Sequence, residues 1–175
     1  MTILTIRNCL DPVLRKKCGL IENIDQELVN LSANMVETMY DSLGVGLAAN
    51  QVGVPSRLIL VDMGFQNEGE KPEKHQPLVI LNPEITCRED EQIGQEGCLS
   101  IPEIFADIAR AQRVEVKGVG LDEKDIRVEV NGYLARAFQH ELDHLDGKLF
   151  WDMLGKVKRD VMKRKFKKML KEKKA

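Results

Sequence analysis

Long apolar runs, cysteines and prolines are all scarce in this 175-residue chain. No stretch approaches the roughly 18 consecutive apolar residues of a membrane-spanning helix, and no basic segment followed by an apolar one opens the chain, so we expect neither a membrane span nor a signal peptide. Four cysteines without an export signal are expected to be free thiols or metal ligands rather than disulfides. Six prolines and a 43% apolar share exclude a collagen-like or wholly disordered chain. The sequence therefore predicts one cytoplasmic domain that folds around its own core.

Net charge is also small, at −2, but the charges are unevenly distributed. Residues 156–175 contain 11 of the 26 basic residues and two of the 28 acidic ones, which gives this segment +9 and the remainder −11. We therefore divide the chain into a domain at 1–155 and a basic C-terminal segment at 156–175. Apolar residues recur at helical spacing in that segment, which predicts a helix over 157–170.

Periodicity and turn residues predict both helices and strands in the domain. Cap residues and closing glycines indicate helices over 11–19, 25–44 and 133–146. Short β-type runs occupy 57–63 and 78–81, with a polar surface loop between them at 64–76. Alternating residues at 114–119 and 126–130 predict an antiparallel hairpin. Strands grouped between helices, with no repeated strand–helix–strand unit, predict an α+β fold.

Two of the three histidines stand four residues apart, in the sequence HELDH at 140–144. On a helix this spacing places the imidazoles of His140 and His144 on one face, where they can hold one divalent metal ion. Glu141 then lies beside the metal, where its carboxylate can act as a base. The alternative is a helix with two surface histidines, and we favour the metal site.

A third metal ligand is not expected after His144. No histidine follows it, and the only later glutamate is Glu172 in the basic segment. Phe150 stands where the longer metalloprotease motif HExxHxxGxxH has its last histidine. The third ligand is therefore expected upstream.

The upstream candidates are His75, a carboxylate or a cysteine. Cys98 stands out among the cysteines because it ends a glycine-bearing loop. The other three fit ordinary core or surface positions: Cys9, Cys18 and Cys87. On the residues alone, the choice among these candidates stays open.

Three segments resemble, in order, the three motifs of the peptide deformylases: GVGLAANQ at 44–51, EGCLS at 96–100 and QHELDH at 139–144. The resemblance extends over most of residues 1–155 and points to a bacterial-type member. It implies a metal-dependent hydrolase that removes the N-formyl group from the formyl-methionine of nascent polypeptides and releases formate. It also implies antiparallel or mixed sheets packed around a central helix that carries the HExxH motif.

The resemblance assigns the metal to Cys98, His140 and His144, with a fourth position left for water. Glu141 takes a proton from that water and passes it to the departing amine. The family commonly uses Fe(II), so we expect Fe(II) here. Ni(II), Co(II) and Zn(II) are the other metals that the resemblance allows, and ligand spacing does not choose between them.

The resemblance further assigns the oxyanion to the side-chain amide of Gln51 and the backbone N–H of Leu99. One preorganised donor of this kind typically contributes about 3–4 kcal/mol. Substrate contacts are implied at Val45, Gly46, Gly97, Tyr133 and Arg136.

Arg136 departs from the family pattern, which usually places an apolar residue there to line the pocket for the methionine side chain. We expect the stem of Arg136 to cover that wall while its guanidinium reaches solvent. The functional alternative is that Arg136 narrows the pocket or contacts an acidic group on the substrate. Tyr133 and Gly94 are expected to shape the same pocket.

Two functions from other classes remain open alongside the deformylase. One is an HExxH metallopeptidase that cleaves internal amides, and the other is a non-enzymatic RNA-binding protein with a structural metal. The basic segment also indicates ribosome association through RNA phosphates. Its alternative is a solvated helix that docks through Val157, Val161 and Met162. We expect a monomer that binds an N-formylmethionyl peptide and no membrane.

Overall fold

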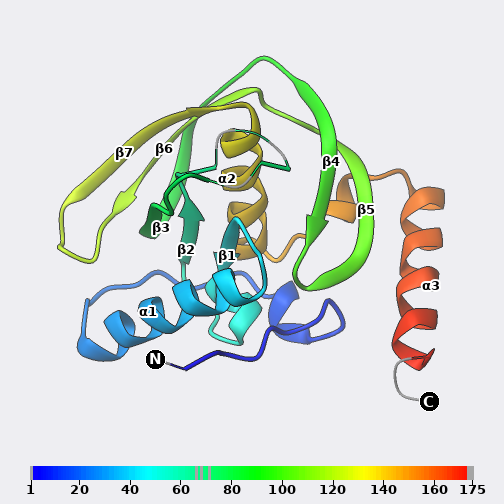
Figure 1. Ribbon diagram of the computed structural model, residues 1–175, viewed down its shortest axis with the longest axis horizontal. Coiled ribbons are helices and arrows are strands. Elements are labelled where there is room, and N and C mark those ends of the chain that lie inside the picture. The colour runs from blue at the N-terminus through cyan, green and yellow to red at the C-terminus, as the bar shows by residue number, and fades with distance from the viewer. Residues whose placement is uncertain (1, 66, 68, 71, 173–175) are drawn as a thin grey trace.

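The computed structural model describes residues 2–65, 67, 69–70 and 72–172, and these form three α-helices and two antiparallel sheets (Figure 1). The five-stranded sheet has the order β1-β2-β3-β6-β7, and the two-stranded sheet pairs β4 with β5. The strands are β1 (Gly46–Ala48), β2 (Leu58–Asp62), β3 (Pro77–Glu89), β4 (Gln92–Cys98), β5 (Ile101–Arg110), β6 (Arg113–Val119) and β7 (Asp125–Asn131). The α+β class predicted from the sequence is confirmed.

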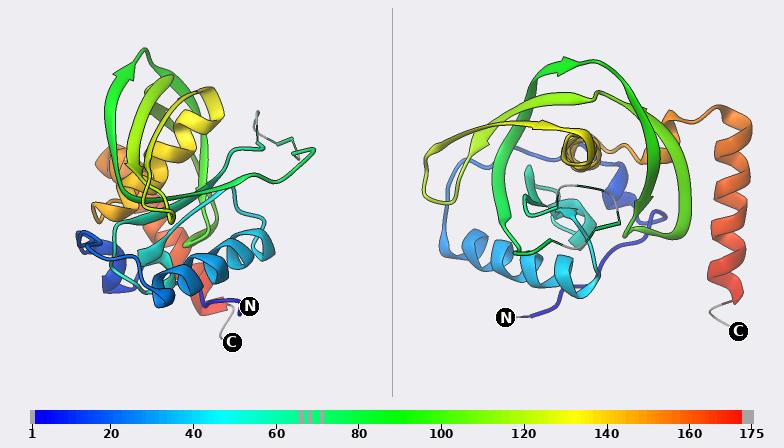
Figure 2. Two further views of the ribbon diagram at one scale, coloured as in Figure 1. Left: turned by 90° about the vertical axis from the view of Figure 1, so that its left-hand side faces the viewer. Right: turned by 45° about the horizontal axis from the view of Figure 1, so that its top comes forward.

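The helices are α1 (Gln26–Asp41), α2 (Gly132–Leu145) and α3 (Lys156–Glu172). Three short 3-10 helices connect the elements: Pro12–Arg15, Ala49–Val52 and Phe150–Met153. Seen end-on, α2 has strands on both sides of it (Figure 2). No helix among the described residues is both long and apolar enough to cross a membrane.

Helix α2 forms because its apolar residues recur every three or four positions and face the five-stranded sheet. They pack on the buried faces of β2, β3 and β6 in one cluster that includes Leu134, Ala135, Phe138, Leu142, Leu145, Ile59, Val61, Ile80, Val114 and Val116. Gly147 ends the turn after α2 with a φ of 72°. A side chain there would also approach the Arg15 backbone oxygen to 2.7 Å, so this position requires glycine.

Helix α3 packs on a second cluster, built by β5 and the 3-10 helix Phe150–Met153. Phe166 is buried, and its ring meets the Trp151 ring edge-on with centroids 6.2 Å apart. Of the three residues named in the docking alternative for the basic segment, Met162 packs partly buried on this cluster, whereas Val157 and Val161 do not dock and are 79% and 50% exposed. They lie on the side of the helix away from Phe166, because five and nine residues correspond to rotations of about 140° and 180°.

Several element boundaries differ from the sequence expectations. Helix α1 begins after Asp25, whose side chain accepts a hydrogen bond from Leu28 N as expected, but ends at Asp41 rather than Gly44. The helix expected over 11–19 is reduced to Pro12–Arg15. Strand β3 runs well beyond 81, and β1, β4 and β5 were not predicted. The hairpin of β6 and β7 and the helices at 133–146 and 157–170 are confirmed to within a few residues. Within 64–76 the described residues carry neither helix nor strand before β3, while 66, 68 and 71, like 173–175 of the basic segment, lie outside them.

Candidate metal centre

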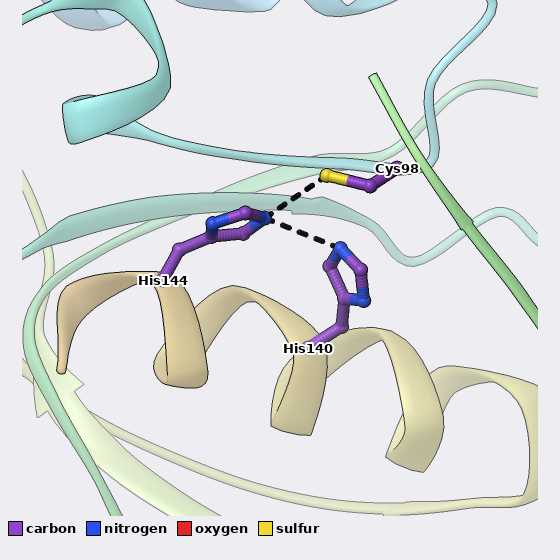
Figure 3. Close-up of side chains that lie close together, drawn as sticks. All are labelled: Cys98, His140 and His144. Carbon is purple, nitrogen blue, oxygen red and sulfur yellow. Dashed lines mark hydrogen bonds between the residues drawn. The ribbon is translucent and has the colours of Figure 1, made fainter. Parts of the chain in front are cut away.

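Three side chains with metal-binding atoms converge where the end of β4 meets α2 (Figure 3). Cys98 is the last residue of β4, and His140 and His144 lie one turn apart on α2. The His144 Nε2 atom is 3.2 Å from Cys98 Sγ and 3.2 Å from His140 Nε2. All three donor atoms lie within 4.8 Å of one another. The helical spacing of the histidines therefore produces the shared face that it predicts.

The structure places the upstream candidates for a third ligand in different surroundings. Cys98 joins the two histidines, whereas His75 lies elsewhere, with its Nδ1 2.6 Å from Asp62 Oδ2 and its ring against Tyr40. The remaining cysteines are free thiols, two of them buried and one exposed: Cys9, Cys18 and Cys87. They occupy the ordinary core and surface positions expected of them.

A buried ion pair behind His140 orients its ring. Glu96 Oε2 lies 3.0 Å from His140 Nδ1, which turns His140 Nε2 toward Cys98 and His144. Arg110 donates two hydrogen bonds to Glu96, at 2.8 and 3.0 Å. Burial raises the pKa of Glu96, but hydrogen bonds from His140 and Arg110 outweigh it and lower that pKa to about 2. The sequence did not predict that Glu96 and Arg110 orient His140, although Glu96 belongs to the EGCLS segment.

The donor set and its surroundings fit a divalent transition metal. One thiol and two imidazole nitrogens are ligands that Fe, Co, Ni and Zn accept. Burial lowers the pKa of His140, yet Cys98, Glu96 and Glu141 around it hold that pKa well above its ordinary value. Burial and the charge of His140 hold the pKa of His144 well below its ordinary value, which keeps that imidazole neutral, the form that can ligate a metal.

Glu141 lies beside the three donors with its carboxylate buried. Its Oε2 atom has no hydrogen-bond partner among the described residues. Burial raises the pKa of Glu141 to about 7, although the positive charge of His140 lowers it and the charge of Glu96 adds to the rise. The approach of Gly46 is close: a Cβ there would fall 2.5 Å from Glu141 Oε1. A carboxylate with these properties can hold or release a proton near neutral pH.

The Gln51 side chain reaches the same centre from the 3-10 helix after β1. Its Oε1 accepts a hydrogen bond from Ala48 N at 2.9 Å, which directs the amide Nε2 the other way. That nitrogen donates to Ser100 Oγ at 3.2 Å and lies 3.6 Å from Cys98 Sγ. Leu99 occupies the turn between β4 and β5, next to Cys98.

A pocket of about 440 Å³ opens onto this centre. Most of the residues singled out in the sequence line it: Val45, Gly46, Gln51, Gly97, Cys98, Leu99, Tyr133, Arg136, His140 and Glu141. The expectation for the Arg136 guanidinium is wrong, because the residue is 6% exposed. The guanidinium hydrogen-bonds to β4 and β5 instead of reaching solvent, since carbonyl acceptors of both strands lie within its reach.

An α+β fold in which a thiol, two imidazoles and a buried carboxylate gather beside one pocket is typical of metal-dependent hydrolases. Comparison with known proteins narrows this class. The model of the polypeptide deformylase family matches residues 3–160. Peptide deformylase of Syntrophobacter fumaroxidans is 47% identical over 172 residues, covering 98% of both chains. That of Thermodesulfovibrio yellowstonii is 47% identical over 167 residues, covering 95% of this chain and 98% of the relative.

Solved structures agree in fold. A peptide deformylase from Legionella pneumophila superposes with a TM-score of 0.89 at 38% identity, covering 98% of both chains. The peptide deformylase of Ehrlichia chaffeensis in complex with actinonin gives 0.88 at 36% identity, covering 97% of this chain and 98% of that one. The chain belongs to the polypeptide deformylase family, metal-dependent hydrolases that remove the N-formyl group from nascent polypeptides. Membership confirms the activity that the three motifs predict, over the metallopeptidase and the RNA-binding protein.

Proposed function

We propose that Cys98, His140 and His144 hold the catalytic metal of this deformylase and that the metal is Fe(II). The observation that carries the proposal is that the three donor atoms lie within 4.8 Å of one another and that Cys98, His140 and Glu141 line one pocket. A divalent metal bound there supplies a water molecule whose pKa is lowered to roughly 7. Glu96 and Arg110 support the site by keeping His140 in the orientation that ligation requires.

Glu141 is the proposed proton carrier of the reaction. Its carboxylate takes a proton from the attacking water while the oxygen bonds to the formyl carbon. It then delivers that proton to the departing amine nitrogen as the carbon–nitrogen bond breaks, which yields formate and a free N-terminus. A pKa raised by burial toward the working pH suits a group that must both accept and donate a proton.

The Gln51 amide Nε2 and the Leu99 backbone N–H are the proposed donors that stabilise the negative charge on the formyl oxygen. The Gln51 amide is preorganised, because its oxygen is held by Ala48 N and cannot exchange places with the nitrogen without losing that bond. Preorganised donors favour the transition state without reorganising during the reaction.

The formyl-methionyl peptide is proposed to bind as an extended strand between β1 and β4. β1 is an edge strand of the five-stranded sheet, and β4 has one partner in its sheet. Gly46 on β1 and Gly97 on β4 both line the pocket, as does Val45. Added strands are recognised by main-chain hydrogen bonds and by pockets for alternate side chains. Tyr133 and the stem of Arg136 line the pocket proposed for methionine.

Substituting Glu141 tests the proton-carrier role. We expect Glu141→Ala to lower formate release from formyl-Met-Ala-Ser by about 10²–10⁴-fold, because a general acid–base group contributes that much. The assay is run anaerobically with Fe(II)-loaded protein, and bound metal is measured on the same sample.

The exposed Glu37 on α1 provides the matched control as Glu37→Ala, which should keep full activity. Glu141→Ala that retains its metal and still releases formate at the rate of the unmodified protein would contradict the assignment. Loss of activity that merely follows loss of metal would do so as well.

We further propose that the protein acts in the cytoplasm as a monomer and associates with the ribosome through α3. The helix carries exposed cations along its length, which suits contact with RNA phosphates. Proximity to the ribosome would place the enzyme where formylated chains emerge.

A further inference from the structure

The two elements that carry the proposed ligands belong to different parts of the fold. His140 and His144 lie on α2, which packs its apolar face on the five-stranded sheet. Cys98 lies on β4, whose hydrogen-bonded strand partner is β5 in a separate sheet. The distance from the thiol to the imidazoles therefore depends on whatever holds β4 and β5 against α2.

Polar side chains of α2 span the junction between α2 and the β4–β5 sheet. Gln139, next to His140, bonds to both backbone groups of Ala111, the residue that directly follows β5: its Oε1 accepts from Ala111 N at 3.1 Å and its Nε2 donates to Ala111 O at 3.0 Å. His140 itself contacts Glu96. Arg136, one turn before His140, makes the widest set of contacts and binds both strands.

The Arg136 guanidinium bonds three acceptors across the two-stranded sheet. Nη1 donates to Gly94 O on β4 at 2.8 Å and to Ile108 O on β5 at 3.1 Å. Nη2 donates to the Gln92 side-chain oxygen at 3.1 Å. Arginine suits this task because its planar fork presents several donors at once, whereas a lysine ammonium is a single point of charge.

Gly94 leaves the room that this arrangement requires. A Cβ at Gly94 would fall 2.2 Å from Arg136 Nη2 and 2.6 Å from Cζ. The guanidinium therefore lies directly on the backbone of β4, four residues before Cys98.

We propose that Arg136 is a positioning residue that sets the spacing between Cys98 and the two histidines. This proposal rests on the metal site of the proposed function. In it, the guanidinium binds the protein's own strands, and only the stem of Arg136 contributes to the substrate pocket. Without the guanidinium, β4 is held to α2 mainly through the contact of Glu96 with His140, so β4 can shift and Cys98 loses part of its alignment with His140 and His144. Groups that orient metal ligands typically change metal affinity by about 10–100-fold when removed.

The test uses full-length protein loaded with Co(II), whose absorption reports thiolate ligation. We expect Arg136→Met to release Co(II) to a chelator about 10-fold faster or more and to weaken the thiolate-to-Co(II) band. Arg136→Lys should release Co(II) at a rate between those of the unmodified protein and Arg136→Met. Gly94→Ala provides a second route, because its methyl group displaces the guanidinium while Arg136 remains in place.

Arg57→Met is the matched control. Arg57 also joins α2 to a strand, bonding Asp146 Oδ1 at 2.9 Å and Pro83 O at 3.2 Å, but it does not touch the β4–β5 sheet. It should lower the melting temperature without changing the thiolate band or accelerating Co(II) release more than about twofold.

Arg136→Met and Gly94→Ala that keep the Co(II) release rate of the unmodified protein would overturn the positioning role and leave the proposed function intact. The positioning role would also be overturned if Co(II) release accelerated in proportion to the loss of melting temperature, and by the same proportion, in the Arg136 and Arg57 variants. Absence of a thiolate band in the unmodified protein would instead overturn the metal site itself, and this inference with it.

Discussion

At the scale of single residues, Asp62 is a carboxylate buried at the end of β2 and held by its surroundings. Its Oδ1 accepts hydrogen bonds from Gly64 N at 2.8 Å and Gln76 N at 2.7 Å, while Oδ2 contacts His75 Nδ1. Burial raises the pKa of Asp62, but these hydrogen bonds outweigh it, and the pKa is lowered overall. The charged form of Asp62 thereby anchors both ends of the loop between β2 and β3.

The lowered pKa predicts how stability varies with pH. Because the folded-state pKa lies below the unfolded value near 3.9, Asp62 stabilises the fold above about pH 4, and this contribution is lost as the pH falls through the folded-state pKa. Asp62→Asn should therefore cost roughly 1–3 kcal/mol at pH 7 and progressively less in acid. Urea unfolding of both proteins at a series of pH values measures the difference.

The exposed Asp41 supplies the comparison. Asp41→Asn should change stability by less than about 0.5 kcal/mol at every pH. A constant difference between the unmodified protein and Asp62→Asn across the acid range would contradict the role of the charged form.

The residues of the candidate site were predictable to different degrees. The pairing of His140 with His144 follows from helical spacing alone, because both imidazoles must share a face. Choosing Cys98 required the family motif, because its place at the end of a glycine-bearing loop still left His75 and the carboxylates as candidates. The direction of Arg136 was predicted wrongly because its acceptors, Gly94 O and Ile108 O, lie 42 and 28 residues away in sequence.

At the scale of elements, β4 and β5 were the largest omission. Residues of β5 do alternate between buried and exposed positions, with Ile104, Ala106 and Ile108 facing inward. Pro102 and Asp107 obscure that pattern in the sequence, since both are uncommon in strands. Strand β4 carries two glycines and few apolar residues, because Gly94 makes room for the Arg136 guanidinium and residues 95–98 line the pocket, so these roles remove the signal that would predict a strand.

The contact between β1 and α2 predicts the effect of a single methyl group. Gly46→Ala would place its Cβ 2.5 Å from Glu141 Oε1, so the carboxylate or the strand must move. We expect kcat/KM for formyl-Met-Ala-Ser to fall by about 100-fold, because displacements near 1 Å at a reacting group have effects of that size.

Gly155→Ala is the control for this change, because a Cβ there has no neighbour within 4 Å among the described residues. It should leave kcat/KM unchanged. Activity of Gly46→Ala within about threefold of the unmodified protein would show that Glu141 tolerates a side chain at this position.

At the scale of the whole molecule, charge separates α3 from the rest of the chain, yet packing attaches it. Phe166 is buried against Trp151, with Met162, Met169 and Leu170 partly buried around it. Deleting the segment would therefore expose part of the core as well as remove charge. Substituting exposed cations separates these two effects.

The four substitutions Lys158→Gln, Lys165→Gln, Lys167→Gln and Lys171→Gln, made together on exposed positions, test the ribosome proposal. Ribosome co-sedimentation should weaken, and its dependence on salt should become shallower by about one unit of slope for each lost phosphate contact. Deformylation of a short peptide should not change, because none of these residues lines the pocket. Unaltered co-sedimentation at every salt concentration would count against the role of α3.

The unpaired edges of β1 and β4 at the pocket affect when a nascent chain can be deformylated. On the proposed binding mode, the substrate must present several N-terminal residues as an extended strand. A chain whose first residues have already coiled into a helix, or entered a folded core, has its backbone groups occupied and cannot pair with either edge. This binding mode would restrict the reaction to the interval between the emergence of a new N-terminus and its incorporation into folded structure.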